Sequence, residues 1–107
     1  MKTINKIRFE LVCVEWIPEV RHMEYGKLYY SEKYSVTNHL CPCGCGTQTP
    51  LPIKTGEWGI AINDDKFTIT PSVLHRTGCQ THYVINDNIV SILGPSVDEN
   101  VMYRILK

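Results

Sequence analysis

The clearest fold signal in the sequence is WGIAINDDKFTIT, which occupies residues 58–70. Both halves are rich in β-branched and aromatic residues, and the Asn-Asp-Asp triplet at 63–65 is typical of a tight turn. The stretch therefore predicts a β-hairpin. Residues 82–93 repeat the design, with apolar segments on either side of Asn-Asp-Asn at 86–88, and predict a second hairpin.

Further strands are expected upstream of the hairpins. Residues 7–16 form one β-rich run, and residues 27–31 and 34–38 have the same character. Residues 96–99 match a helix capping box, and the apolar residues from 97 to 106 recur at helical spacing. We expect a mainly β fold: a small single-domain sandwich or open barrel of about six to eight short strands with a short C-terminal helix.

Length and composition indicate one globular domain over residues 1–107. Apolar residues make up 43% of the chain and charged residues 21%, which argues against disorder. The formal net charge is zero, so no basic surface indicates nucleic-acid binding. No run reaches the roughly 20 apolar residues that a membrane helix needs, and no secretory signal is visible. We therefore expect a cytoplasmic protein without membrane association, in a compartment that keeps thiols reduced.

Two short boxes hold four of the five cysteines, and the fifth, Cys13, is expected to be a buried apolar residue. The first box is HLCPCGCG at residues 39–46, and the second is GCQTH at residues 78–82. Zinc prefers thiolate sulfur and imidazole nitrogen, and the glycines and proline allow the tight loops that present them. We therefore predict that both boxes close on one zinc ion. The candidate ligands are Cys41, Cys43, Cys45, Cys79 and His82.

These five candidates compete for the four positions of a tetrahedral site. Cys79 and His82 have the two-residue gap of a zinc knuckle. We pair them with Cys41 and Cys43, and Cys45 is the replacement. The remaining thiol would be a hydrogen-bond partner or a reactive group beside the ion. Two alternatives stay open: an iron–sulfur cluster, although the loops do not match a Rieske centre, and a redox or catalytic thiol.

The two boxes and several flanking residues resemble a family of small bacterial zinc-binding proteins without an established activity. The similarity covers roughly residues 9–93, and the last strand departs from it by ending in Ile92-Leu93 where that family commonly has tryptophan. The matching features are Gly26-x-Leu28-Tyr29-x-Ser31, the 39–46 box, Trp58, Thr70-Pro71-Ser72-Val73 and Gly78-Cys79-x-x-His82-Tyr83. Members are often encoded beside ubiquitin-like proteins and their ThiF-type activating enzymes, some in anti-phage defence settings. The resemblance implies a zinc site and a protein partner in a ubiquitin-like conjugation system.

The leading hypothesis is a non-enzymatic, zinc-stabilised interaction or adaptor module, accessory to a bacterial ubiquitin-like conjugation or anti-phage defence system. Its metal would cross-link a small core and so contribute directly to folding. The alternative is a thiol-dependent enzyme or transfer factor that uses a spare cysteine of residues 41–45 as nucleophile, with His39 as base. No phosphate-binding glycine loop, nucleophile elbow or His-Glu-x-x-His motif occurs, so no catalytic residue is predicted.

Overall fold

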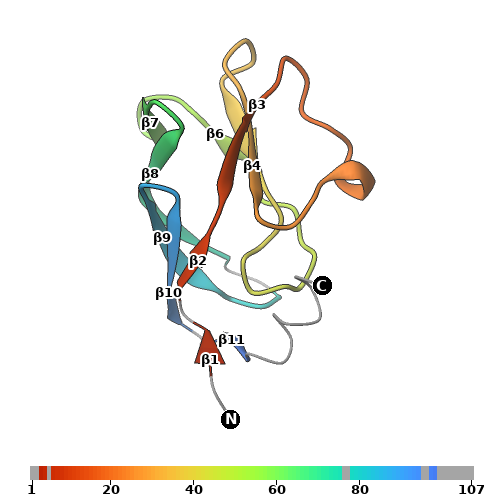
Figure 1. Ribbon diagram of the computed structural model, residues 1–107, viewed down its shortest axis with the longest axis vertical. Coiled ribbons are helices and arrows are strands. Elements are labelled where there is room, and N and C mark those ends of the chain that lie inside the picture. Colours follow the sequence, from red (N-terminus) through yellow and green to blue (C-terminus); the bar gives the residue numbers. More distant parts are fainter. Residues whose placement is uncertain (1–2, 5, 76–77, 95–96, 99–107) are drawn as a thin grey trace.

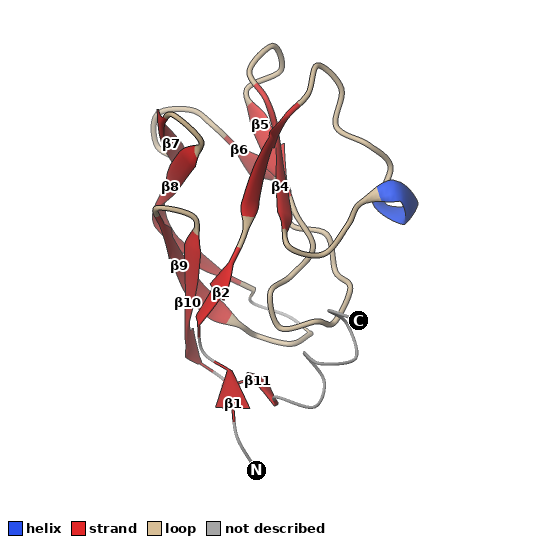
Figure 2. Ribbon diagram, viewed as in Figure 1, coloured by secondary structure: helices blue, strands red, loops and turns tan. Residues whose placement is uncertain are grey.

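The computed structural model describes residues 3–4, 6–75, 78–94 and 97–98, and these residues form a mainly β structure (Figures 1 and 2). The described part has two main sheets and no closed barrel, which confirms the predicted fold class. Its strands are shorter and more numerous than predicted. They are β1 (Thr3–Ile4), β2 (Lys6–Arg8), β3 (Glu10–Cys13), β4 (Lys27–Ser31), β5 (Val36–Asn38), β6 (Leu51–Pro52), β7 (Gly59–Asn63), β8 (Lys66–Leu74), β9 (His82–Asn86), β10 (Ile89–Gly94) and β11 (Val97–Asp98), with one 3-10 helix, η1 (Val20–His22).

The two predicted hairpins build most of a five-stranded antiparallel sheet in the order β2-β10-β9-β8-β7. β7 pairs with β8 and β9 pairs with β10, so both hairpins are confirmed. The second turn places Asp87 and Asn88 at φ 47° and 69°, a left-handed conformation that Asp and Asn tolerate better than most residues. Asn88 also joins the two hairpins, because its Oδ1 accepts a hydrogen bond from the Phe67 N–H at 2.6 Å.

A bulge interrupts β8 where it pairs with β9. The register changes between two pairs, Ile69 with Ile85 and Val73 with Tyr83. Residues 70–72 of β8 consequently lie opposite the single residue Val84. Extra residues in one strand bend it and redirect its side chains. The bulge therefore sets the direction of Ser72, close to the end of β8.

The second main sheet has four strands in the order β3-β4-β5-β6. The sequence predicts one strand over residues 7–16, but the chain divides at Phe9: β2 joins the five-stranded sheet, whereas β3 runs parallel to β4. Phe9 is fully buried, and its N–H donates to the Asn88 carbonyl at 2.7 Å. Burial of this large aromatic side chain between the sheets is the physical reason for the break.

The core lies between the two main sheets, which Figure 1 shows on opposite sides of the molecule. Its buried members are Ile7, Phe9, Leu28, Leu51, Phe67, Ile69, Val73, Tyr83, Ile85, Val90 and Ile92. Cys13 is exposed on the outer strand β3, so the prediction that it is buried is wrong. Outer strands have a partner on one edge only, and the end of such a strand is easily left in solvent.

The chain ends fall partly outside the described residues. β1 pairs with β11, so Val97 and Asp98 are extended rather than helical. The rest of the predicted C-terminal helix, from residue 99 onward, lies outside the described residues. Among the helices that the structure describes, none is long and apolar enough to cross a membrane.

Candidate functional site

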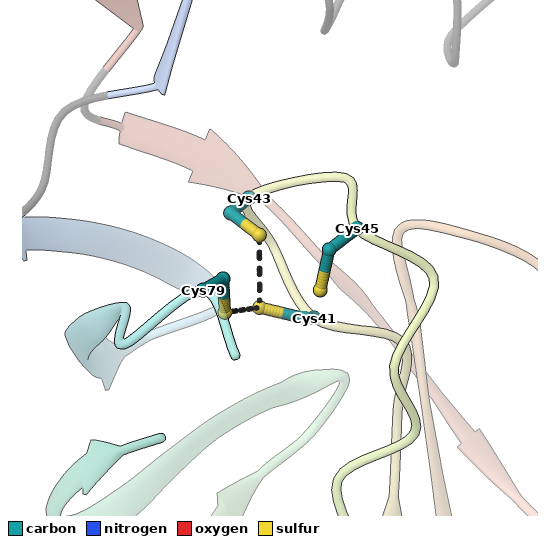
Figure 3. A group of neighbouring side chains, drawn as sticks. All are labelled: Cys41, Cys43, Cys45 and Cys79. Carbon is teal, nitrogen blue, oxygen red and sulfur yellow. Dashed lines mark hydrogen bonds between the residues drawn. The ribbon is translucent and has the colours of Figure 1, made fainter. Parts of the chain in front are cut away.

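Four cysteines from two loops converge on one point, with their side chains directed toward one another (Figure 3). Cys41, Cys43 and Cys45 belong to the loop between β5 and β6, and Cys79 belongs to the loop between β8 and β9. Their sulfur atoms all lie within 4.8 Å of one another. Cys41 Sγ is 3.4 Å from Cys43 Sγ and 3.7 Å from Cys79 Sγ. The fold thus brings the two sequence boxes together, with every cysteine of both boxes in the group.

Backbone hydrogen bonds hold the first box in a tight loop. The Cys41 N–H donates to the Thr47 carbonyl at 2.8 Å, and the Gly44 N–H donates to the Cys41 carbonyl at 3.0 Å. Gly44 and Gly46 have φ values of 91° and 83°, which favour glycine because it has no Cβ. These two glycines therefore produce the curvature that turns three alternate side chains to the same side.

The four sulfur atoms form a donor set that can hold a metal ion and suits zinc. Tetrahedral zinc binds thiolate at about 2.3 Å, which places ligand sulfurs roughly 3.8 Å apart. The sulfur–sulfur separations of 3.4 and 3.7 Å, with all four sulfur atoms within 4.8 Å of one another, are close to that spacing. A set of soft sulfur donors without carboxylates disfavours magnesium and calcium.

The thiols differ in how readily they ionise. Burial raises the pKa of the Cys41 and Cys43 thiols. Burial acts in the same direction on Cys79, but the neighbouring Thr81 and the Cys43 and Cys41 thiols outweigh it and lower the Cys79 pKa to about 7. Cys79 is therefore substantially ionised at neutral pH, whereas the buried thiols need a nearby cation to lose their protons.

The fifth predicted ligand, His82, lies outside this group of sulfur atoms. It is the first residue of β9 and pairs with Leu74 of β8. Its imidazole Nε2 is 3.0 Å from the hydroxyl Oγ of Ser72. Both residues are half-buried, so they are held by their surroundings and are still reachable from solvent.

A serine hydroxyl that is hydrogen-bonded to histidine is the smallest arrangement that activates an oxygen nucleophile. The imidazole can accept the hydroxyl proton while the oxygen attacks a carbonyl carbon. Ser72 is not among the residues predicted from the sequence to carry chemistry, although it lies in the 70–73 segment that supports the family resemblance. No local motif marks this serine, because only the pairing of β8 with β9 places it beside His82.

A tryptophan contacts Ser72, and an open hollow lies beside the two residues that precede it. The Trp58 indole Nε1 donates to the Ser72 carbonyl oxygen at 3.4 Å. The hollow has a volume of about 620 Å³ and is lined by residues 53–60, Thr70 and Pro71, a size typical of ligand sites. Ser72, the candidate nucleophile, is therefore the next residue in the chain after Thr70 and Pro71, which line a hollow that a substrate could enter.

Buried side chains connect the first cysteine box to the strand that carries His82. Tyr83 is fully buried, and its hydroxyl is 2.7 Å from Nε2 of His39. His39 is also fully buried, and burial lowers its pKa to about 3, so its imidazole is neutral at physiological pH. Because His39 precedes Cys41 by two residues, this contact fixes the start of the cysteine loop against β9.

Comparison with known proteins gives one match. A family model described as "Bacterial ubiquitination-like system serine protease (BubE)" matches residues 13–93, well over half of the chain. No curated protein and no solved structure matches the chain. The family description agrees with the ubiquitin-like setting that the sequence resemblance implies, and it adds a serine protease activity that the resemblance did not include.

Proposed function

Because this chain belongs to the BubE family of the bacterial ubiquitination-like system, we propose that it is a serine hydrolase with Ser72 as nucleophile and His82 as general base. The observation that carries the proposal is the 3.0 Å separation of His82 Nε2 and Ser72 Oγ. A serine and a histidine ten positions apart have no local reason to meet, so the register of β8 with β9 has to create the contact. The substrate class is an amide bond of a protein partner in the ubiquitination-like system.

The chemistry follows from these two side chains. Ser72 Oγ forms a bond to the substrate carbonyl carbon while His82 Nε2 takes the hydroxyl proton. Collapse of the tetrahedral intermediate breaks the carbon–nitrogen bond, and His82 returns its proton to the departing amine. Water then attacks the resulting Ser72 ester with His82 again as base, which releases the carboxylic acid and restores the serine.

The four cysteines serve a structural role in this proposal, and the chain is a single zinc-stabilised domain. Cys41, Cys43, Cys45 and Cys79 would supply all four ligands of a closed tetrahedral zinc site, with no position left for water. His82 is then free for catalysis. With all four cysteines as ligands, no cysteine of residues 41–45 would be left as the nucleophile that a thiol-dependent enzyme requires.

An interaction or adaptor module, the function that the sequence favours, is the competing proposal. It shares the zinc site and the protein partner, and it differs in predicting that Ser72 is chemically inert. A cytoplasmic location fits both proposals, because the described cysteines are all free thiols and a reducing compartment keeps them so.

A fluorophosphonate probe, which modifies only activated serines, separates the two functions. We expect it to label Ser72 in the metal-loaded protein and to leave Ser72→Ala unlabelled. His82→Ala should slow labelling by roughly 10²–10⁴-fold, the usual contribution of a general base. Ser91→Ala is the matched control, because Ser91 is also half-buried in the five-stranded sheet and should not change labelling. A folded protein that the probe does not label at Ser72 would favour the adaptor.

A further inference from the structure

The edge of β8 beside Ser72 has no strand partner on one side. β7 pairs with β8 from Asn63 and Lys66 as far as Gly59 and Thr70, and there β7 ends. β8 continues to Leu74, and in the described part of the chain only β9 pairs with that continuation. Such an open edge can accept an added strand.

The hydrogen-bond pattern shows which backbone groups face that open edge. The His75 N–H donates to the Thr81 carbonyl at 3.0 Å, so residues 75 and 81 form a hydrogen-bonded antiparallel pair. The adjacent pair, Leu74 with His82, is then non-hydrogen-bonded, because the two kinds of pair alternate. The N–H and C=O of Leu74 therefore point away from β9, toward the open edge. The Ser72 carbonyl faces the same side, where it meets the Trp58 indole.

Two hollows adjoin this edge and share Trp58. One is the hollow of about 620 Å³ lined by residues 53–60, Thr70 and Pro71. The other has a volume of about 280 Å³ and is lined by residues 48–51, Trp58 and residues 73–75. Trp58, which contacts Ser72, therefore lines two separate spaces that could take side chains.

We propose that the substrate is recognised as an extended, unfolded polypeptide segment that adds a strand to β8 at Leu74 and carries its scissile bond past Ser72. This inference rests on the proposed serine hydrolase function. Backbone groups of Leu74 would pair with the substrate main chain, and the two hollows beside Trp58 would take its side chains. An extended segment fits this position because main-chain pairing supplies affinity while alternate side chains supply selectivity.

Peptidyl phosphonate esters test the inference, since they modify an activated serine and carry a peptide arm. We would compare three compounds on the metal-loaded protein: one with an acetyl cap, one with a tetrapeptide arm of mixed sequence, and one with the same arm methylated on its backbone nitrogens. The peptide arm should accelerate modification of Ser72 at least tenfold over the acetyl cap. N-methylation should remove most of that gain, because it deletes main-chain donors without changing the side chains.

Two variants of one position test the same edge from the protein side. Leu74→Pro removes the backbone N–H that faces the open edge, and it is tolerable there because that group is not part of the β8–β9 ladder. The ratio of the tetrapeptide-arm rate to the acetyl-cap rate, measured on the same variant, should fall by about tenfold. Leu74→Ala keeps the N–H and shortens an exposed side chain that lines the smaller hollow, so it should lose clearly less of that ratio than Leu74→Pro.

The outcomes separate this inference from the proposed function. Modification of Ser72 at equal rates by all three compounds would overturn strand addition and leave the serine hydrolase intact. Equal rates for the plain and N-methylated arms would also overturn it, even if Leu74→Pro fails to fold. Failure of every compound to modify Ser72 in folded protein would overturn the serine hydrolase and this inference together.

Discussion

The proposed zinc site should supply a large part of the stability of this domain. Cys41 and Cys79 are 38 positions apart in the chain. For a cross-link over a loop of that length, the loop-entropy relation gives a stabilisation of about 4 kcal/mol at 25 °C. A metal ion bound to both loops imposes the same constraint on the unfolded chain. Domains of this size are stable by only roughly 5–15 kcal/mol in total, so loss of the ion should be plainly measurable.

The assay is thermal unfolding of the metal-loaded protein followed by circular dichroism, with elemental analysis before and after chelation. We expect about one zinc per chain and a fall in melting temperature of roughly 15–30 °C on its removal, at about 4–8 °C per kcal/mol. Cys79→Ala should show a similar loss without chelator.

Cys13→Ala is the matched control for that experiment, since Cys13 is an exposed cysteine outside the group. Its free energy of unfolding should change by no more than about 0.5 kcal/mol. An unchanged melting temperature after complete removal of metal would refute the cross-link argument, and so would an equal loss in Cys13→Ala.

Three further predictions concern the packing that supports the site, and each is checked by denaturant unfolding. Phe9→Ala should destabilise the protein by about 3–5 kcal/mol, because it empties the fully buried crossing between the sheets. Asn88→Ala should cost roughly 1–3 kcal/mol, since the Phe67 N–H and the Asp65 carbonyl lose their side-chain partner, whereas the exposed neighbour Asp87→Ala should cost clearly less. Tyr83→Phe should cost about 1–3 kcal/mol because it leaves His39 Nε2 buried without its hydroxyl partner. An unchanged free energy of unfolding would show that the His39–Tyr83 contact does not stabilise the protein.

The parts of the fold that depend on neighbouring residues could be predicted from the sequence. Each hairpin carries its own turn chemistry, so strands β7 to β10 follow from local pattern. The break at Phe9 could not be predicted in this way, since residues 7–16 have one uninterrupted β-rich pattern. The first half of this run pairs with one sheet and the second half with the other, so the break depends on long-range pairing that the local pattern does not contain.

The candidate site also has a part that can be predicted from local sequence and a part that cannot. The cysteines are recognisable from spacing, because ligand type and loop-forming glycines are local features. His82 looks like the fourth ligand in sequence, since it follows Cys79 at the spacing of a zinc knuckle. In the structure His82 contacts Ser72, and that contact depends on a bulge and a strand register, neither of which can be predicted from a single sequence.

The metal group and the Ser72–His82 pair are coupled by the chain that joins them. Cys79 lies three residues before His82, and between them Thr81 accepts the His75 N–H that closes the β8–β9 pairing. On the other side, Tyr83 is tied to His39 at the start of the first box. β9 therefore enters the sheet from a segment that would be held by the ion and by a buried hydrogen bond. A catalytic pair needs its partners held within about 0.5 Å, and an otherwise open loop end could not provide that. In the proposed function, the cysteines would thus hold the Ser72–His82 geometry without touching the substrate, so a structural metal and a serine nucleophile are compatible in one domain.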